Sequence, residues 1–419
     1  MKSGIKSGRL AKFAIPALFL TLLWASLPGT EAFAQEAAAQ QPKQAIACDN
    51  NKLCGIIGID DDWDVEPSFK DINPFSDGLA CAEDQSGKWG FIDIKGDWVV
   101  KPLFDDLYWS FSEGLAKANQ GGKWGFIDTQ GNWAIPAQFD YVDDFIDSIA
   151  GASQGGKWGF IDVNGAWFVQ PEFEDVYYFS DGLAEAKKGG KWGFIDEYGD
   201  WVVQPELDDV ELDFRGGISR VEKDGLWGFI DNEGRWVINP QFDDVEDLNE
   251  GLASAKKGGK WGFIDKNGKW VIEPRFDSVL FFSGGLAGAS EGGKWGFIDN
   301  KGAWVIEPKF EGVFNFSEGL ARAKQNDLWG FIDKTGAWVI QPEYQDTWNF
   351  SDGLVSVEKD GKWGVIDKSA KWVIEPQFDL AILFSGGLAE ARKNNEWGII
   401  DTKGAWVVEP HYSYLSLIL

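Results

Sequence analysis

A carboxylate recurs along the chain and is the first candidate for chemistry. An Asp follows each Trp-Gly-Phe-Ile segment or its close variant, from Asp93 and Asp128 to Asp401. Regularly spaced carboxylates could ligate Ca²⁺, and a pair of them could act as acid and base on a glycan. A Gly usually stands three residues later, as Gly96 does after Asp93. A type I turn explains that Gly and a metal site does not, so we expect these Asp side chains to accept hydrogen bonds from the following backbone N–H groups.

Other residue types offer no stronger reactive site. The acidic run of Asp60, Asp61, Asp62, Asp64 and Glu66 resembles a metal ligand set, but such runs are more often solvated surface. His411 is the only histidine, which excludes His-based catalytic triads and paired His metal ligands. No phosphate-binding glycine loop stands between a strand and a helix. The sequence therefore predicts a protein that is not an enzyme, with no metal site and no cofactor.

Aromatic residues that break the internal pattern are better candidates for binding. The segments that link one repeat to the next carry a regular Phe, and the two positions before it vary. Some units have acidic pairs there, such as Asp143 with Asp144. Loops on a rigid scaffold often carry binding sites, and the alternative is variable packing against the next unit. The candidate ligand-binding residues are Trp109, Tyr177, Tyr178, Phe281, Phe314 and Trp348.

The elements that position these residues come from an internal repeat. Trp-Gly recurs from Trp89 to Trp397 in steps of 34 or 35 residues, and a second Trp stands nine residues after each first one. A Pro follows shortly afterwards, and a degenerate copy around Cys54-Gly55 precedes the series. The sequence therefore contains about eleven copies of one unit.

Each unit predicts three strands, at 79–84, 88–93 and 97–101 in the copy around Trp89. Pairs such as Gly121-Gly122 suit a two-residue hairpin turn between the first two strands. Asp-x-x-Gly suits a turn with a bulge before the third strand, which places Ile92 opposite Trp98 and Phe91 opposite Val99. We expect Pro102 to end the third strand, because it has no N–H to donate.

The predicted fold is all-β, with three-stranded meanders stacked on one another. Both faces of each small sheet are apolar, so neighbouring units must cover them. Gly90 and its equivalents would leave room for an indole of the adjacent unit. Propellers usually have about 4–8 blades, so eleven units favour an open β-solenoid, with tandem small propellers as the alternative. The degenerate first unit and the apolar tail 412–419 are the expected end caps.

The repeated motif Lys-Trp-Gly-Phe-Ile-Asp-x-x-Gly-x-Trp-Val-Ile-x-Pro-x-Phe-Asp closely resembles that of the WG-repeat, or KWG-repeat, family of bacterial proteins. The resemblance covers residues 53–412 in ten near-perfect copies and one degenerate copy. It implies a β-rich array that serves as an interaction module, and it brings no catalytic motif.

The N-terminus predicts export. A basic stretch (Lys2, Lys6, Arg9, Lys12), an apolar run and the small-x-small pattern Ala32-Phe33-Ala34 are typical of a cleaved signal peptide. We therefore expect a signal peptide over 1–34, a flexible leader over 35–52 and the repeat array over 53–419. The expected location is periplasmic or secreted, with no membrane span after cleavage.

The net charge and the cysteines indicate which partners and which disulfides to expect in that compartment. The formal net charge of −28 repels nucleic-acid phosphates, so nucleic acid is not an expected partner. An oxidising compartment allows one disulfide among Cys48, Cys54 and Cys81. An ideal hairpin places Cys48 and Cys54 on opposite faces, which favours a Cys54–Cys81 pair across stacked units.

The sequence favours a non-catalytic scaffold that binds a protein partner in the envelope or medium. The alternative is binding of cell-wall polysaccharide through the irregular aromatic residues. An exposed row of Trp109, Tyr177 and Trp348 would favour the polysaccharide, and buried rings would favour the protein scaffold.

Overall fold

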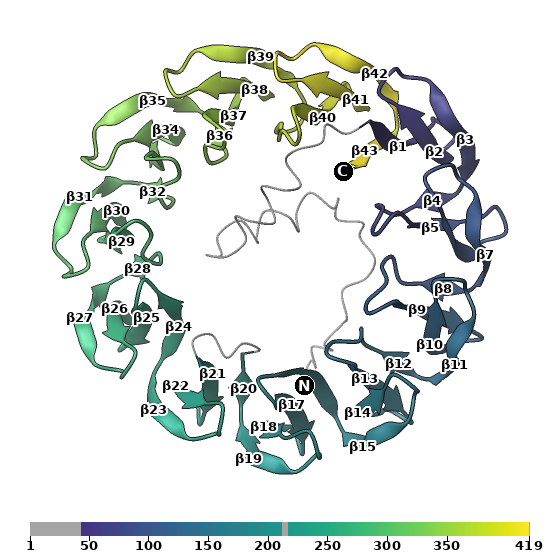
Figure 1. Ribbon diagram of the computed structural model, residues 1–419. Helices are drawn as coiled ribbons and strands as arrows, with labels where there is room; N and C mark the ends of the chain where they lie inside the picture. Colours follow the sequence, from purple (N-terminus) through teal and green to yellow (C-terminus); the bar gives the residue numbers. More distant parts are fainter. Residues whose placement is uncertain (1–42, 212–216, 419) are drawn as a thin grey trace, which may run out of the picture.

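Eleven small β-sheets stand around a common axis and form one closed ring (Figure 1). The computed structural model describes residues 43–211 and 217–418. Within them, ten sheets have four antiparallel strands and one has three. The molecule is an eleven-bladed β-propeller, so the predicted open solenoid of three-stranded units is wrong. The propeller alternative is correct in kind, although one ring replaces the tandem pair.

The blades are numbered 1 to 11 in chain order, and their strands occupy four concentric positions, of which blade 11 lacks the innermost among the described residues (Figure 1). The innermost strands are β43 (Tyr414–Ile418), β4 (Asp71–Ile72), β8 (Asp106–Leu107), β12 (Tyr141–Val142), β16 (Asp175–Ser180), β20 (Asp209–Val210), β24 (Asp244–Asn249), β28 (Ser278–Val279), β32 (Gly312–Val313) and β36 (Asp346–Thr347). The second strands are β1 (Gln44–Cys48), β5 (Ala80–Glu83), β9 (Leu115–Gln120), β13 (Ile149–Gln154), β17 (Leu183–Lys188), β21 (Ile218–Lys223), β25 (Leu252–Lys257), β29 (Ala287–Glu291), β33 (Ala321–Gln325), β37 (Leu354–Lys359) and β40 (Leu388–Lys393).

The third strands carry the Trp-Gly motif, and the outermost strands begin at the second Trp of each unit. The third strands are β2 (Cys54–Gly58), β6 (Trp89–Ile92), β10 (Lys123–Asp128), β14 (Lys157–Asp162), β18 (Lys191–Ile195), β22 (Leu226–Asp231), β26 (Lys260–Asp265), β30 (Lys294–Ile298), β34 (Leu328–Ile332), β38 (Lys362–Asp367) and β41 (Glu396–Asp401). The outermost strands are β3 (Trp63–Phe69), β7 (Trp98–Phe104), β11 (Trp133–Phe139), β15 (Trp167–Phe173), β19 (Trp201–Leu207), β23 (Trp236–Phe242), β27 (Trp270–Phe276), β31 (Trp304–Phe310), β35 (Trp338–Tyr344), β39 (Trp372–Phe378) and β42 (Trp406–Tyr412).

The innermost strand is the element that the sequence analysis missed. It lies in the linking segment and is often only two residues long, as in β8, where Asp106 pairs with Asn119 and Leu107 with Ala118. Asp and a single aliphatic residue are typical of a turn, so nothing local marks this strand. It forms because the neighbouring blade supports it and its backbone pairs with the second strand.

Side-chain size bends the stack into a ring. The second strands, near the axis, carry small buried residues such as Ala116 and Ala118, whereas the third and outermost strands carry Phe, Ile and Trp. Neighbouring blades therefore approach more closely near the axis than at the rim. An alternation of small and large side chains that follows the taper is common in closed β-architectures.

The hydrophobic core is divided among the junctions between blades. In the part of the chain described, eleven buried clusters each combine residues of two consecutive blades, with one cluster at each junction. At one junction Phe91 and Val100 of blade 2 pack against Leu107 and Ile127 of blade 3. Blades 11 and 1 share a cluster of the same kind, so the series has no uncovered end.

The two chain ends close the ring together. β43 supplies the innermost strand of blade 1 and pairs with β1 over five residues, from Gln44 opposite Ile418 to Cys48 opposite Tyr414. Ser413 Oγ donates hydrogen bonds to the carbonyl oxygens of Cys48 and Asp49. The first unit and the apolar tail were predicted to cap two separate ends, and instead they pair with each other. Part of the predicted leader 35–52 therefore belongs to the ring as β1, and the predicted signal peptide 1–34 lies outside the described residues.

The pairing of the third and outermost strands corrects two predictions. Ile92 lies opposite Trp98 as expected, but Phe91 lies opposite Val100 and Val99 points to solvent, because the strands carry an additional irregularity. Pro102 does not end the strand, since β7 is an outer edge whose N–H groups need no partner.

Gly90 does not receive an indole from the next unit. A Cβ there would lie 2.4 Å from the carbonyl oxygen of Val100 and 2.8 Å from Cζ3 of Trp98, both of the same blade. The Gly of the Trp-Gly motif therefore accommodates the outer strand of its own blade.

Candidate functional site

The predicted ligand-binding residues lie on the inner rim, which is defined here as the two positions that follow the aliphatic residue of each innermost strand. Five of them are substantially exposed: 44% for Trp109, 39% for Tyr177, 43% for Tyr178, 46% for Phe281 and 42% for Phe314. Trp348 is half-buried and packs against the core between blades 9 and 10. The six residues come from blades 3, 5, 8, 9 and 10, so the structure distributes them around the ring.

A recurring Phe anchors each rim loop. Phe111 packs at a tilt against Phe91 of the preceding blade with ring centroids 4.5 Å apart, and Phe145 packs at a tilt against Phe126 with centroids 4.6 Å apart. The anchor requires Phe in nearly every unit. The two positions before it lie beyond this contact, which leaves their side chains free to differ from blade to blade.

Two of the exposed rings, Tyr177 and Phe314, are held in defined orientations. Tyr177 stacks on Trp192, with centroids 5.3 Å apart and planes at 19°. Phe314 lies over the guanidinium of Arg322, 3.6 Å from Cζ to the ring centroid, and 5.5 Å from Trp329. Burial lowers the pKa of Arg322 to about 10, which still leaves it charged at neutral pH. A cation beneath an aromatic face favours this geometry.

Blades 6 and 7 present carboxylates at the same positions. Glu211, Glu246 and Asp247 surround Arg220, at 3.1, 3.3 and 3.0 Å respectively. The Arg220 side chain is largely buried, whereas the Glu211 side chain is half exposed and the Glu246 side chain is more than half exposed. Burial raises the pKa of Glu246, and the nearby guanidinium opposes that shift. We call these three residues the acidic sector, and Phe281, Phe314 and Trp348 of blades 8 to 10 the apolar sector.

Residues beneath the rim were missed by the sequence analysis. One position of each second strand faces the third-strand Phe or its equivalent, and it holds a different residue in many blades, including Lys117, Glu185, Arg220, Arg322, Ser356 and Glu390. Several of these bond the innermost strand of the next blade: Arg322 donates to the Thr347 carbonyl, and Glu390 accepts from Leu417 N–H. The sequence pattern that could have revealed these residues is a variable residue between two small ones, as in Ala116-Lys117-Ala118.

The repeated Asp residues have the turn role predicted for them. Oδ1 of Asp128 accepts hydrogen bonds from the N–H groups of Gln130 and Asn132 at 2.9 and 2.8 Å. The bond from Asn132 is the main reason that the pKa of Asp128 lies below its usual value. Among the residues that the structure describes, no three His, Cys, Asp or Glu side chains gather in a way that could hold a metal ion.

The predicted disulfide is wrong. Cys54 bonds to Cys48, and Cys81 is a buried free thiol. The hairpin between β1 and β2 does not have an ideal two-residue turn: Asp49 N–H bonds the Leu53 carbonyl, and Lys52 adopts positive φ. This longer turn shifts the register so that Cys48 lies directly opposite Cys54. Cys81 instead donates toward the Leu107 carbonyl, and burial raises the pKa of its thiol strongly.

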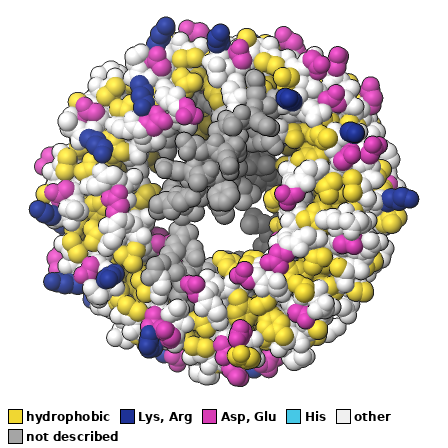
Figure 2. Space-filling model, viewed as in Figure 1, with side chains coloured by type: hydrophobic (Ala, Val, Ile, Leu, Met, Phe, Trp, Pro, Cys, Tyr) yellow, Lys and Arg dark blue, Asp and Glu magenta, His cyan; other side chains and the backbone are white. Residues whose placement is uncertain are grey.

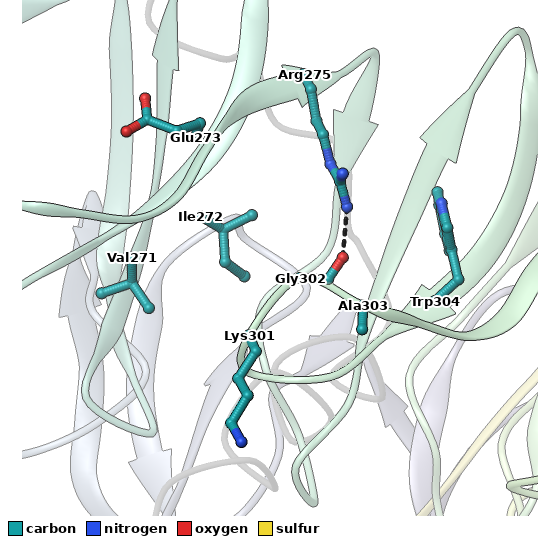
Figure 3. A pocket seen from close by; sticks show the side chains of 8 residues that line it. All are labelled: Val271, Ile272, Glu273, Arg275, Lys301, Gly302, Ala303 and Trp304. Carbon is teal, nitrogen blue, oxygen red and sulfur yellow. Dashed lines mark hydrogen bonds between the residues drawn. The ribbon is translucent and has the colours of Figure 1, made fainter.

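A hollow that none of the candidate rim aromatics lines is shown in Figure 3. It measures about 490 Å³ and lies between β27 of blade 7 and the turn that leads into β31 of blade 8. Arg275 spans it with a hydrogen bond to the Gly302 carbonyl, beside Val271 and Trp304. Glu273 is the only carboxylate among the residues that line this hollow. None of the other lining side chains is a nucleophile or general base that could act together with Glu273.

The side chains around the central opening differ in charge from the periphery. On the face shown in Figure 2, acidic side chains border the opening, and none of the visible Lys or Arg side chains of the described residues does. Across the described residues, no helix is long and apolar enough to span a bilayer.

Solved structures with a similar arrangement are remote in sequence. One is a eukaryotic initiation factor, with 10% identity, a TM-score of 0.42 and coverage of 90% of this chain and 98% of that one. Another is Hsv2p of Kluyveromyces lactis, with 12% identity, a TM-score of 0.33 and coverage of 58% and 98%. A third is the extracellular domain of a putative hybrid two-component system of B. thetaiotaomicron, with 11% identity, a TM-score of 0.25 and coverage of 89% and 65%.

Sequence comparison with curated proteins finds no match. The family model described as "WG containing repeat", in contrast, matches in eleven consecutive segments: 60–89, 89–124, 124–158, 158–192, 192–227, 227–261, 261–295, 295–329, 329–363, 363–397 and 397–417. These segments cover most of the chain and follow the Trp-Gly periodicity. The segment 89–124, for example, runs from the third strand of blade 2 into the third strand of blade 3. The chain belongs to the WG-repeat family.

Proposed function

We propose that this protein is a non-catalytic, extracytoplasmic scaffold that binds a partner protein on the inner rim of its ring. One observation carries the proposal: aromatic residues are exposed at positions where the packing of the blades requires none. Exposed aromatic side chains on a rigid framework are typical of protein-binding surfaces. The predicted export signal supports the extracytoplasmic location.

Site-specific photo-crosslinking in the host tests the proposal. A photoreactive residue replaces Phe281 or Phe314 on the inner rim, or Val305 on the outer strand β31 as a control. Val305 is exposed to a similar extent as the two Phe residues. We expect both rim positions to crosslink the same discrete protein in the envelope or medium, and the control position not to do so. Absence of a rim-specific product would contradict the proposal.

Binding of cell-wall polysaccharide is the second candidate, and the exposure of Trp109 and of the Tyr177–Tyr178 pair favours it. Indole and phenol rings are common platforms for sugars, and a long polymer could contact several blades. Trp348, the third ring of the row predicted for this function, is half-buried. The irregular row is the reason that we rank the protein partner first.

Co-sedimentation of the purified protein with insoluble host cell-wall polysaccharide tests this second candidate. A Trp109→Ala/Trp348→Ala variant is compared with the unmodified protein. If the unmodified protein sediments with the polysaccharide and the variant does not, polysaccharide binding becomes the first candidate function and protein binding the second. If neither protein sediments, that polymer is not the ligand.

A further inference from the structure

The acidic and apolar sectors occupy consecutive blades. Figure 1 shows β24, β28, β32 and β36 following one another around the inside of the ring. Glu246 and Asp247 follow the start of β24, and Phe281, Phe314 and Trp348 follow β28, β32 and β36 in turn. The inner rim therefore changes from carboxylates to aromatic rings between blades 7 and 8.

Three carboxylates gather around one buried cation. Among the residues that the structure describes, the Arg220 side chain forms ion pairs with Glu211, Glu246 and Asp247. The guanidinium is only 12% exposed, whereas the side chains of Glu211 and Glu246 are 50% and 59% exposed. A partner that approaches from solvent therefore meets the exposed carboxylates of Glu211 and Glu246.

Phe281 and Phe314 of the apolar sector are exposed, and Phe314 is also held in place. One side of Phe314 lies against Arg322 and Trp329. Rings that are already held in place lose little conformational freedom when a partner covers them, which favours binding. The two Phe side chains have no hydrogen-bonding group, and a sugar hydroxyl gains none from them.

We propose that the inner rim of blades 7 to 9 binds a segment of a protein in which basic residues stand next to apolar residues. This inference rests on the proposed function and names the chemistry of the partner. The basic side chains lie on the acidic sector, and the apolar side chains cover Phe281 and Phe314. Opposite charge on this rim accelerates encounter and sets the orientation of the segment, while the apolar contact supplies most of the affinity.

Titration of the purified protein with synthetic peptides tests the inference. One pair of peptides joins four Lys or Arg residues to four Leu or Trp residues, in the two possible orders. A third peptide replaces the basic residues with Glu, and a fourth replaces the apolar residues with Ser. We expect at least one peptide of the first pair to bind at least tenfold more tightly than the third and fourth, with binding weakened by salt.

Matched variants separate the two sectors. Phe281→Ala/Phe314→Ala is expected to weaken binding at least tenfold, and Glu246→Gln/Asp247→Asn to reduce both the affinity and its salt dependence. Val305→Ala/Val339→Ala on the outer strands removes similarly exposed apolar groups and should leave binding unchanged. An unchanged circular dichroism spectrum and melting temperature establish that each variant is folded.

The inference fails if the Glu peptide binds as tightly as the basic ones, or if the rim variants bind as the unmodified protein does. Its failure can be told apart from that of the proposed function. Rim-specific crosslinking to a native protein without binding of any basic–apolar peptide would overturn this inference and leave the scaffold proposal standing.

Discussion

At the junctions between blades the same side chains recur around the ring, whereas the inner rim changes from one blade to the next. Phe263 and its equivalents are fully buried, and each fills the same place between neighbouring sheets. At the rim the corresponding positions hold Tyr177 in blade 5, Glu246 in blade 7 and Phe314 in blade 9. Packing thus fixes one set of residues and leaves the other set available for recognition.

The largest expected loss of stability comes from changing a residue at a junction between blades. Phe263→Ala removes a buried ring and leaves a cavity between two blades, which should lower the free energy of unfolding by about 3–5 kcal/mol. Phe281→Ala, at an exposed position, should change it by less than about 0.5 kcal/mol. Chemical denaturation measures both. Equal losses in the two variants would mean that the rim ring is part of the core.

The Gly of the Trp-Gly motif gives the next largest effect. In Gly90→Ala the new methyl group meets the Val100 carbonyl and the Trp98 ring, so the outer strand must shift. We expect a loss of about 1–3 kcal/mol in the free energy of unfolding. Gly114→Ala is not a suitable control, because Gly114 has positive φ, which also strains the variant. Ala134→Gly, in the outer strand β11, serves better. A stability of Gly90→Ala equal to that of the unmodified protein would show that the strand adapts without cost.

The disulfide should have an intermediate effect that is specific to the closing blade. Cys48→Ser/Cys54→Ser opens a short loop in the sheet that joins the two ends of the chain. Loop entropy predicts a loss of about 2 kcal/mol. Reductant should destabilise the unmodified protein by a similar amount and leave the double variant unchanged. A melting temperature that responds to reductant in both proteins would point to Cys81 instead.

Acid should produce the smallest effect, spread over many turns. The pKa values of Asp128, Asp162, Asp265 and Asp367 are lowered, mainly by hydrogen bonds that these carboxylates accept in the turns. A lowered folded-state pKa contributes stability above the usual value of 3.8, and that stability is lost as the pH falls through the folded-state value. The melting temperature should therefore fall progressively below about pH 4. Asp128→Asn should weaken this dependence slightly, and an unchanged profile in a variant with several such substitutions would exclude the turns as its source.

Local chemistry explains which parts of the fold could be predicted. The two-residue turn at Gly121-Gly122 was predicted correctly, because both residues adopt the positive φ that glycine tolerates. The turn that contains Ser86 and Gly87 is longer than two residues, since Asp84 accepts the hydrogen bonds of an Asp-x-x-Gly turn there. The same kind of turn at Asp49 reversed the cysteine prediction.

The features that could not be predicted depend on distant partners. The innermost strand at Asp106–Leu107 has no strand propensity of its own and exists because it pairs with Asn119 and Ala118. Ring closure depends on the summed taper of all the junctions, which no single repeat reveals. The rim aromatics were found from the sequence because they depart from the repeat, but their grouping into sectors needed the order of the blades around the axis.

The closing strand has a consequence for how the chain folds. Ser413 and Cys48 are 365 residues apart, so the pairing of β43 with β1 closes a very long loop and is expected to form after the local hairpins. Until then, blades 1 and 11 expose complementary apolar faces, which can meet within one chain or between two. Within a chain the effective concentration of the two ends is fixed, whereas between chains it rises with the amount of protein. Dilute refolding should therefore give closed monomeric rings, and concentrated refolding should give domain-swapped oligomers joined through the same strand pair.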